Sequence, residues 1–92
     1  MKYLVVYDIT EDDVRNKVRN TLKDYGGNRI QYSAFVFDKS EIEMIQIMLK
    51  IKKIIGNTKG KVIAIPICAR DIDKVVTIAY KYELPEEDSV IV

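Results

Sequence analysis

The order of apolar and polar residues divides the chain into segments with alternating strand and helix patterns. Residues 3–7 are a continuous apolar run rich in β-branched and aromatic residues, which is typical of a strand buried on both faces. Asp8 ends this run, and Thr10 follows at the position expected for a helix N-cap, with Asp13 completing a variant of the capping box. Residues 14–25 then carry apolar side chains at helical spacing: Val14, Val18, Leu22 and Tyr25. We therefore predict a strand followed by a helix that stops at the glycine pair 26–27.

Residues 29–37 alternate between two faces, which indicates either one long strand or two short strands joined by a sharp bend. A second capping box, Ser40-Glu-Ile-Glu43, opens a predicted helix that runs to about residue 55. The apolar surface of this helix is unusually broad. One stripe consists of Ile42, Ile45 and Leu49, and the other side carries Met44, Ile47, Met48, Ile51 and Ile55. The surplus predicts burial against a neighbouring helix or a second chain.

The last third of the chain has weaker patterns. Residues 61–68 are typical of a strand, and Pro66 makes it an edge strand or a bulged one. Residues 71–82 fit a helix or a strand, and the β-branched run within them favours the strand. A polar link over 84–88 leads to the apolar end 89–92, which needs a sheet to join, such as the edge of a partner subunit. This order of elements predicts an α+β, ferredoxin-like βαββαβ sandwich, with residues 1–92 as a single domain.

Composition limits the chemistry. The 92 residues include one cysteine, Cys68, and no histidine, which excludes an internal disulfide, a cysteine-based zinc cluster and a Ser-His triad. Any reaction must therefore use carboxylates, Tyr, Lys, Arg or Ser. No apolar stretch is long enough for a signal-peptide core or a bilayer span, so we expect a cytoplasmic protein with no membrane partner and a reduced Cys68.

The net charge of +1 conceals an uneven distribution. Residues 44–70 carry six basic and no acidic side chains, whereas residues 71–92 carry two basic and six acidic ones. The basic residues of the middle segment are Lys50, Lys52, Lys53, Lys59, Lys61 and Arg70. They could contact phosphate, or they could solubilise a helix end and complement its dipole.

Asp8 is the most informative acidic residue, because it directly follows a buried strand, where ligands of α/β sheets often bind. It is a candidate Mg²⁺ ligand, and two copies brought together by a two-fold axis would make a better site than one. Alternatively, Asp8 bonds the following turn or helps to cap the helix. Arg15 and Arg29 could hold phosphate near such a metal, and Phe35 could stack on a base. Their alternatives are a solvated helix shoulder, a strand-edge charge and an ordinary interface aromatic.

These residues together resemble a known pattern. Tyr7-Asp8-Ile9, then Arg15, then Gly27-x-Arg29-x-Gln31-x-Ser33-x-Phe35 resemble the small CRISPR-associated endoribonuclease family, the second core protein of spacer acquisition. Weaker similarity extends to residues 65–68, 74–76 and 90–92. The resemblance implies a ferredoxin-like homodimer with an extra C-terminal strand, within residues 83–92, that is exchanged onto the sheet of the partner subunit.

The resemblance also implies an activity and its residues. Members are Mg²⁺-dependent nucleases that act on single-stranded RNA or double-stranded DNA, and they bridge two dimers of the CRISPR integrase. Asp8 would be the metal ligand at the dimer axis. Other residues implied for catalysis or substrate contact are Tyr7, Arg15, Arg29, Ser33 and Phe35, and those for nucleic-acid binding are Arg15, Lys17, Arg19 and Arg29. The family often has a second arginine where this chain has Lys17, which keeps the charge but loses the bidentate grip on phosphate.

Three functions are therefore open at this point: a Mg²⁺-dependent endonuclease, a non-catalytic bridge that holds spacer DNA in the integrase complex, and a small-molecule regulatory module of the ferredoxin-like class. The third ranks last because the chain has no obvious glycine-rich ligand loop.

Overall fold

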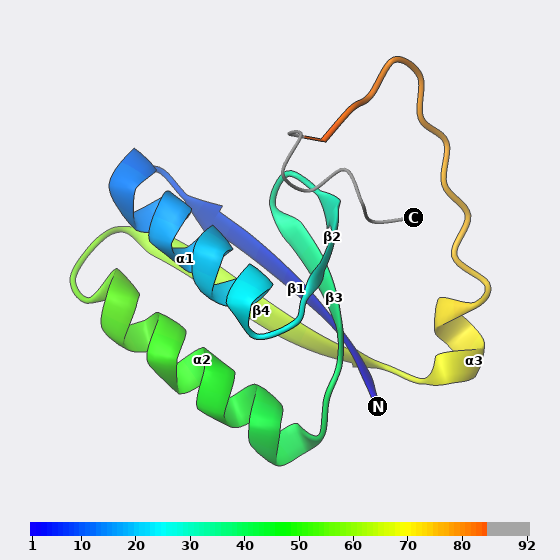
Figure 1. The fold of residues 1–92 in the computed structure, drawn as a ribbon, viewed down its shortest axis with the longest axis horizontal. Helices are drawn as coiled ribbons and strands as arrows, with labels where there is room; N and C mark the ends of the chain where they lie inside the picture. Colours follow the sequence, from blue (N-terminus) through cyan, green and yellow to red (C-terminus); the bar gives the residue numbers. More distant parts are fainter. Residues whose placement is uncertain (85–92) are drawn as a thin grey trace.

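Four strands form one antiparallel sheet, and two long helices cover one of its faces (Figure 1). The structure is a computed structural model that describes residues 1–84. The elements are β1 (Lys2–Ile9), α1 (Asp12–Asp24), β2 (Asn28–Gln31), β3 (Ala34–Asp38), α2 (Glu41–Ile55), β4 (Gly60–Ile67) and α3 (Ala69–Ile72). The strand order β2-β3-β1-β4 is that of a ferredoxin-like sandwich, which confirms the predicted fold class.

Strand β1 lies inside the sheet, and its side chains alternate between the two faces. Tyr3, Val5, Tyr7 and Ile9 are buried beneath the helices. Leu4, Val6 and Asp8 lie on the opposite face, which neither α1 nor α2 covers. The prediction that this strand is buried on both faces is wrong for the single chain, because both helices pack on the same side.

The uncovered side of the sheet, here called the open face, is mostly apolar. Strand register places residues of three strands on it: Leu4, Val6 and Asp8 of β1, Val36 of β3, and Lys61, Ile63 and Ile65 of β4. Val6, Ile63 and Ile65 are 37%, 40% and 41% exposed. An apolar sheet face of this kind indicates an interaction surface.

Residues 29–37 form two strands, which settles the alternative that the sequence left open. β2 and β3 pair as a hairpin around residues 32–33, and the register shifts between Arg29 and Gln31. Arg29 pairs with Phe35, so both side chains belong to the helix-covered side of the sheet.

The two long helices differ in how they begin. Helix α1 begins at Asp12 behind Glu11, and no side chain caps it, so the predicted N-cap at Thr10 is wrong. The predicted apolar stripe of α1 is confirmed at Val18 and Leu22, which are fully buried, whereas Tyr25 is exposed. Helix α2 begins after Ser40, and both hydrogen bonds of the predicted capping box are present.

Helix α2 carries the predicted apolar surplus on its outside. Met44, Ile47 and Ile51 belong to the core, whereas Ile42, Ile45 and Leu49 are 69%, 53% and 55% exposed. Between α2 and β4 runs an open apolar groove of about 520 Å³, whose floor and walls include Tyr3, Met48 and Ala64. Within the described residues, nothing covers the outer stripe of α2.

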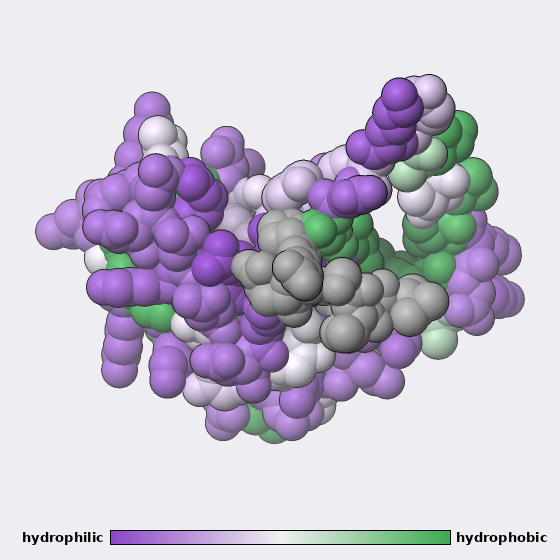
Figure 2. Space-filling view, turned by 45° about the horizontal axis from the view of Figure 1, so that its top comes forward, coloured by the Kyte–Doolittle hydropathy of each residue, from purple (hydrophilic) through white to green (hydrophobic). Residues whose placement is uncertain are grey.

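Strand β4 is an edge strand that contains Pro66, as predicted. The strand predicted over 71–82 is wrong for the single chain. Residues 69–72 form the short helix α3, and residues 75–80 run as an exposed arm without regular structure (Figures 1 and 2). The arm has the composition of a strand, but it has no neighbouring strand to complete its hydrogen bonds. The predicted strand 89–92 lies outside the described residues.

The chain then returns to the turn between β2 and β3. The Tyr82 hydroxyl accepts a hydrogen bond from the Tyr32 amide at 3.0 Å, and the Tyr32 hydroxyl donates to the Glu83 carbonyl at 2.7 Å. The two tyrosine rings meet edge to face, 5.4 Å apart. These contacts fasten the end of the described chain beside the hairpin turn.

Candidate active site

Asp8 occupies the second-last position of β1, on the open face of the sheet. Its side chain is exposed and makes no hydrogen bond or ion pair with any residue that the structure describes. The alternative role of Asp8 as a cap for the following turn therefore has no support in these contacts. Lys61 of β4 lies directly opposite Asp8 in the antiparallel register, and it too is exposed. Directly opposite residues place their Cβ atoms about 5 Å apart, so the two charges are neighbours.

Tyr7 precedes Asp8 and therefore points to the other side of the sheet, where it is 3% exposed. Its hydroxyl donates a hydrogen bond to the Tyr32 carbonyl at 2.9 Å. Burial raises the pKa of the Tyr7 phenol, and the nearby positive charge of Arg29 partly opposes that shift. Tyr7 is thus a neutral donor that ties β1 to the hairpin turn.

Arg29 is buried to 4% exposure, which requires compensation for its charge. Its Nη2 and Nε atoms donate to the same Tyr32 carbonyl, at 2.8 and 3.3 Å. The guanidinium also lies over the rings of Tyr32 and Phe35, with its central carbon 5.5 and 6.0 Å from their centroids. Three donors, one from Tyr7 and two from Arg29, therefore converge on one carbonyl oxygen.

Phe35 is fully buried beneath the helices. Its ring stacks with Tyr7 at a centroid distance of 6.3 Å and contacts Phe37 at 6.5 Å. The expectation that Phe35 stacks on a base is therefore wrong for this conformation, because no base can reach a ring without exposed surface.

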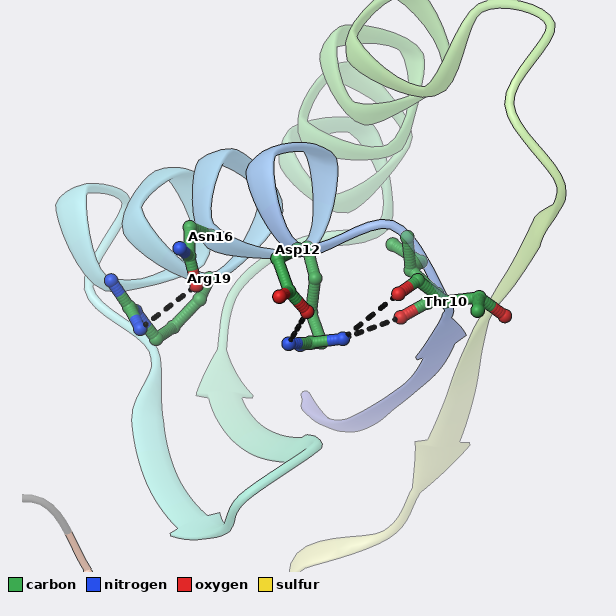
Figure 3. A network of polar contacts seen from close by, with 6 residues as sticks. Thr10, Asp12, Asn16 and Arg19 are labelled. Atoms are coloured by element: carbon green, nitrogen blue, oxygen red, sulfur yellow. Dashed lines mark hydrogen bonds and ion pairs between the residues drawn. The ribbon is translucent and has the colours of Figure 1, made fainter.

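Two arginines of α1 lie beside the hairpin turn, and their partners differ (Figure 3). Arg15 donates to the carbonyls of Ile9 and Thr10 at 3.1 and 3.2 Å and forms an ion pair with Asp12. Arg19 donates to the side-chain amide oxygens of Asn16 and Asn20, at 3.1 to 3.3 Å.

A polar pocket of about 210 Å³ opens among these groups. It is lined by Tyr7, Arg15, Asn16, Arg19, Arg29, Tyr32 and Ser33. Five of the residues predicted for the site thus meet here, on the helix-covered side of the sheet, and three of them carry guanidinium groups. Asp8 is on the open face, and Lys17 is exposed on α1 without lining the pocket. The structure therefore divides the predicted residues between two faces of the sheet.

The described residues contain no group of three or more Asp, Glu, Cys or His side chains placed to hold one metal ion. Asp8 offers a single exposed carboxylate, whereas Mg²⁺ commonly takes one or two carboxylates with water and substrate phosphate completing the shell. One chain therefore supplies the smallest number of carboxylates that Mg²⁺ commonly takes, and two Asp8 side chains together would supply the larger number.

Two residues near the site, Tyr32 and Lys61, were not among the predicted site residues. The Tyr32 carbonyl is its central acceptor, and a backbone atom leaves no signal in side-chain patterns. The sequence places Lys61 in the basic segment 44–70, but only the strand register distinguishes it from the other basic residues of that segment.

Among the described helices, none is long and apolar enough to span a membrane.

The chain is similar to CRISPR-associated proteins named Cas2. Residues 1–75 match the family of CRISPR associated protein Cas2. A CRISPR-associated endoribonuclease Cas2 from Desulforudis audaxviator is 40% identical over 87 residues, which cover 95% of this chain and 82% of the relative. A CRISPR-associated endonuclease Cas1/endonuclease Cas2 fusion from Thermoproteus tenax is 61% identical over 36 residues, 39% of this chain and 14% of the fusion.

The fold is also similar to that of a solved Cas2 structure. The crystal structure of Streptococcus pyogenes Cas2 at pH 6.5 superposes with a TM-score of 0.74 at 23% identity, over 86% of this chain and all of the other. With a family match over most of its length and a relative that is 40% identical over 95% of this chain, this chain belongs to the Cas2 family of CRISPR-associated proteins.

Proposed function

We propose that this protein is a Mg²⁺-dependent endonuclease that acts as a homodimer on RNA or duplex DNA during the acquisition of new CRISPR spacers. One observation carries the proposal: Asp8 is an exposed carboxylate without an ionic partner among the described residues, at the end of a strand on an apolar sheet face. Family membership supports the activity, since the Desulforudis audaxviator relative is named an endoribonuclease.

The open face supports a homodimer. Its apolar residues cover one side of the sheet and end at Asp8, so a second copy that buries this face about a two-fold axis near Asp8 brings a second Asp8 close to the first. In this arrangement residues 83–92 pair with the partner subunit as the additional strand, because the outer edge of β4 has no partner among the described residues. The exposed arm 75–80, with Val76 and Ile78 86% and 95% exposed, supplies further apolar surface for the same association.

The metal site is then a pair of Asp8 carboxylates. When bound there, Mg²⁺ would neutralise charge on the scissile phosphate and lower the pKa of a bound water. Asp8 keeps a carboxylate exposed at the entrance of the shared site, where substrate can approach. Lys61, opposite Asp8, offers an ammonium group to a phosphate oxygen of the same strand.

Nucleic-acid backbone binding is assigned to the cations of α1 and the hairpin. Arg19 is the best candidate, because its hydrogen-bond acceptors among residues 1–84 are neutral amide oxygens and its charge stays available for phosphate. Lys17 is exposed on the same helix, and Arg29 adds positive charge to the pocket from within.

A second candidate function is a non-catalytic bridge that holds spacer DNA between integrase dimers. The separation of Asp8 from the arginine pocket favours it. The arginine pocket lies on the helix-covered side and Asp8 on the open face, so backbone binding need not involve Asp8. The Thermoproteus tenax relative supports partnership with a second CRISPR-associated protein, since its name joins Cas1 and Cas2 in one chain.

The test compares wild type with Asp8→Asn in Mg²⁺-dependent cleavage of labelled single-stranded RNA and duplex DNA, with binding to both measured in parallel. Loss of a metal ligand should cost more than the 10- to 100-fold that outer-shell changes cost, so we expect cleavage to fall by about 100-fold or more while binding stays unchanged. Asp24→Asn, an exposed aspartate on α1, is the matched control and should cut like wild type.

Two results would contradict the catalytic proposal. If Asp8→Asn cuts as fast as wild type, Asp8 does not serve the reaction. If both proteins bind DNA and neither cuts, the bridge is the function of this chain.

A further inference from the structure

Arg15 makes contacts that phosphate binding does not explain. Its Nη1 donates to the carbonyls of Ile9 and Thr10, and its Nη2 pairs with the carboxylate of Asp12 (Figure 3). These three acceptors span the connection between β1 and α1, from Ile9, directly after Asp8, to Asp12 at the start of the helix. One guanidinium therefore holds the last residue of the strand, the link and the first residue of the helix.

No side chain caps the start of α1. The helix begins behind Glu11, whose side chain makes no capping hydrogen bond. The planar fork of arginine can serve acceptors in several directions at once, which the single ammonium of lysine does not reproduce. Arg15 thus fixes the connection by donating to its oxygen atoms, and it does so from inside the helix.

Arg19 provides the contrast, four residues later on the same helix. Its described partners are the neutral amide oxygens of Asn16 and Asn20, whereas Arg15 has a carboxylate partner and two carbonyls. The positive charge of Arg15 is therefore partly neutralised and most of its donors are in use.

From these contacts we infer that Arg15 is a positioning residue, which fixes the link after β1 and thereby the orientation of Asp8, rather than a ligand of the nucleic-acid phosphate. The role in cleavage rests on the proposed function of Asp8. The role in ordering residues 9–12 does not, and it can be measured without any activity.

The experiment compares Arg15→Gln, Arg15→Lys and the matched Arg19→Gln, each as the full chain. For Arg15→Gln we expect Mg²⁺-dependent kcat to fall about tenfold or more, since misplaced catalytic groups cost up to about 100-fold, with KM and duplex affinity unchanged. Arg15→Lys should not restore kcat, because it keeps the charge and loses the fork. Arg19→Gln should weaken duplex binding and lower the slope of log affinity against log salt by about 1.

Amide hydrogen exchange supplies the readout that is independent of cleavage. We expect faster exchange at residues 9–12 in Arg15→Gln and Arg15→Lys, and no change there in Arg19→Gln. Unaltered amide exchange at residues 9–12 in Arg15→Gln would overturn the inference. A second contradicting result would be full activity of Arg15→Lys together with a smaller slope of log affinity against log salt in Arg15→Gln. If wild type shows no Asp8-dependent cleavage, the proposed function fails, and the exchange data alone decide the role of Arg15.

Discussion

At the scale of single residues, Tyr7 shows how a side chain in a functional pattern can serve the fold. It is almost fully buried, it packs on Phe35, and its hydroxyl shares the Tyr32 carbonyl with Arg29. The contacts of Tyr7 and Arg29 hold the hairpin turn against β1. We therefore expect changes at Tyr7 to affect stability before they affect the reaction.

Tyr7→Phe tests this view. Removing the hydroxyl loses one hydrogen bond, while Arg29 still satisfies the Tyr32 carbonyl, so the free energy of unfolding should fall by about 1 kcal/mol at pH 7. The raised pKa of Tyr7 stabilises the wild-type fold below the ordinary phenol value of 10.0, and this contribution is lost as the pH rises above it. Urea unfolding between pH 7 and pH 11 should therefore show a shallower alkaline loss in Tyr7→Phe. A variant with normal stability and no cleavage would instead make Tyr7 a catalytic residue.

At the scale of elements, the two helix starts show which local signals are reliable. The Ser40 box was predicted correctly because its two hydrogen bonds involve only residues four positions or fewer apart. Thr10 had a suitable side chain and spacing, but α1 begins two residues later behind Glu11, and no side chain caps it. The residue types of a capping box therefore do not by themselves fix where a helix begins.

Ser40→Ala should lower the free energy of unfolding by about 1 kcal/mol, because the Ser40 hydroxyl accepts from the Glu43 amide at 3.1 Å. The contribution of this capping box to stability also depends on pH. Hydrogen bonds from the Ser40 backbone and side chain lower the pKa of Glu43 below its ordinary 4.5. Its contribution to stability is therefore present above pH 4.5 and is lost as the pH falls through the lowered pKa. Thermal unfolding between pH 3 and pH 7 should show a smaller acid loss in Glu43→Gln than in wild type, and Glu41→Gln should behave like wild type.

At the scale of the whole molecule, the unpaired surfaces lie on one side of the sheet and along one helix. The open face, the outer edge of β4 and the arm 75–80 all carry exposed apolar residues. A second copy on the open face would cover most of this area and complete the Asp8 site, whereas the outer stripe of α2 would stay free for another contact.

Ile65→Glu tests that arrangement, since Ile65 is 41% exposed on the open face, opposite Leu4 of β1. A charge buried without a partner should raise the dimer dissociation constant on the order of 100-fold, and Asp8-dependent cleavage should fall with it. Sedimentation velocity over a concentration series measures the first effect. Ile42→Glu, on the outer stripe of α2, is the matched control and should remain dimeric; if it dissociates instead, the interface lies on α2.

The sequence by itself determined the order of β1, α1, α2 and β4, the Ser40 cap, the choice of an edge or a bulge for β4 and the Cas2 pattern around Asp8. These features depend on periodicity, local hydrogen bonds and residue identity, all of which are visible along the chain. Only the tertiary structure decided which face of the sheet stays open, that Asp8 and the arginine pocket lie on opposite sides of it, and that Phe35 is out of reach. Those outcomes depend on strand register and on both helices packing on the same side, because adjacent residues of a strand then separate into a covered and an uncovered face.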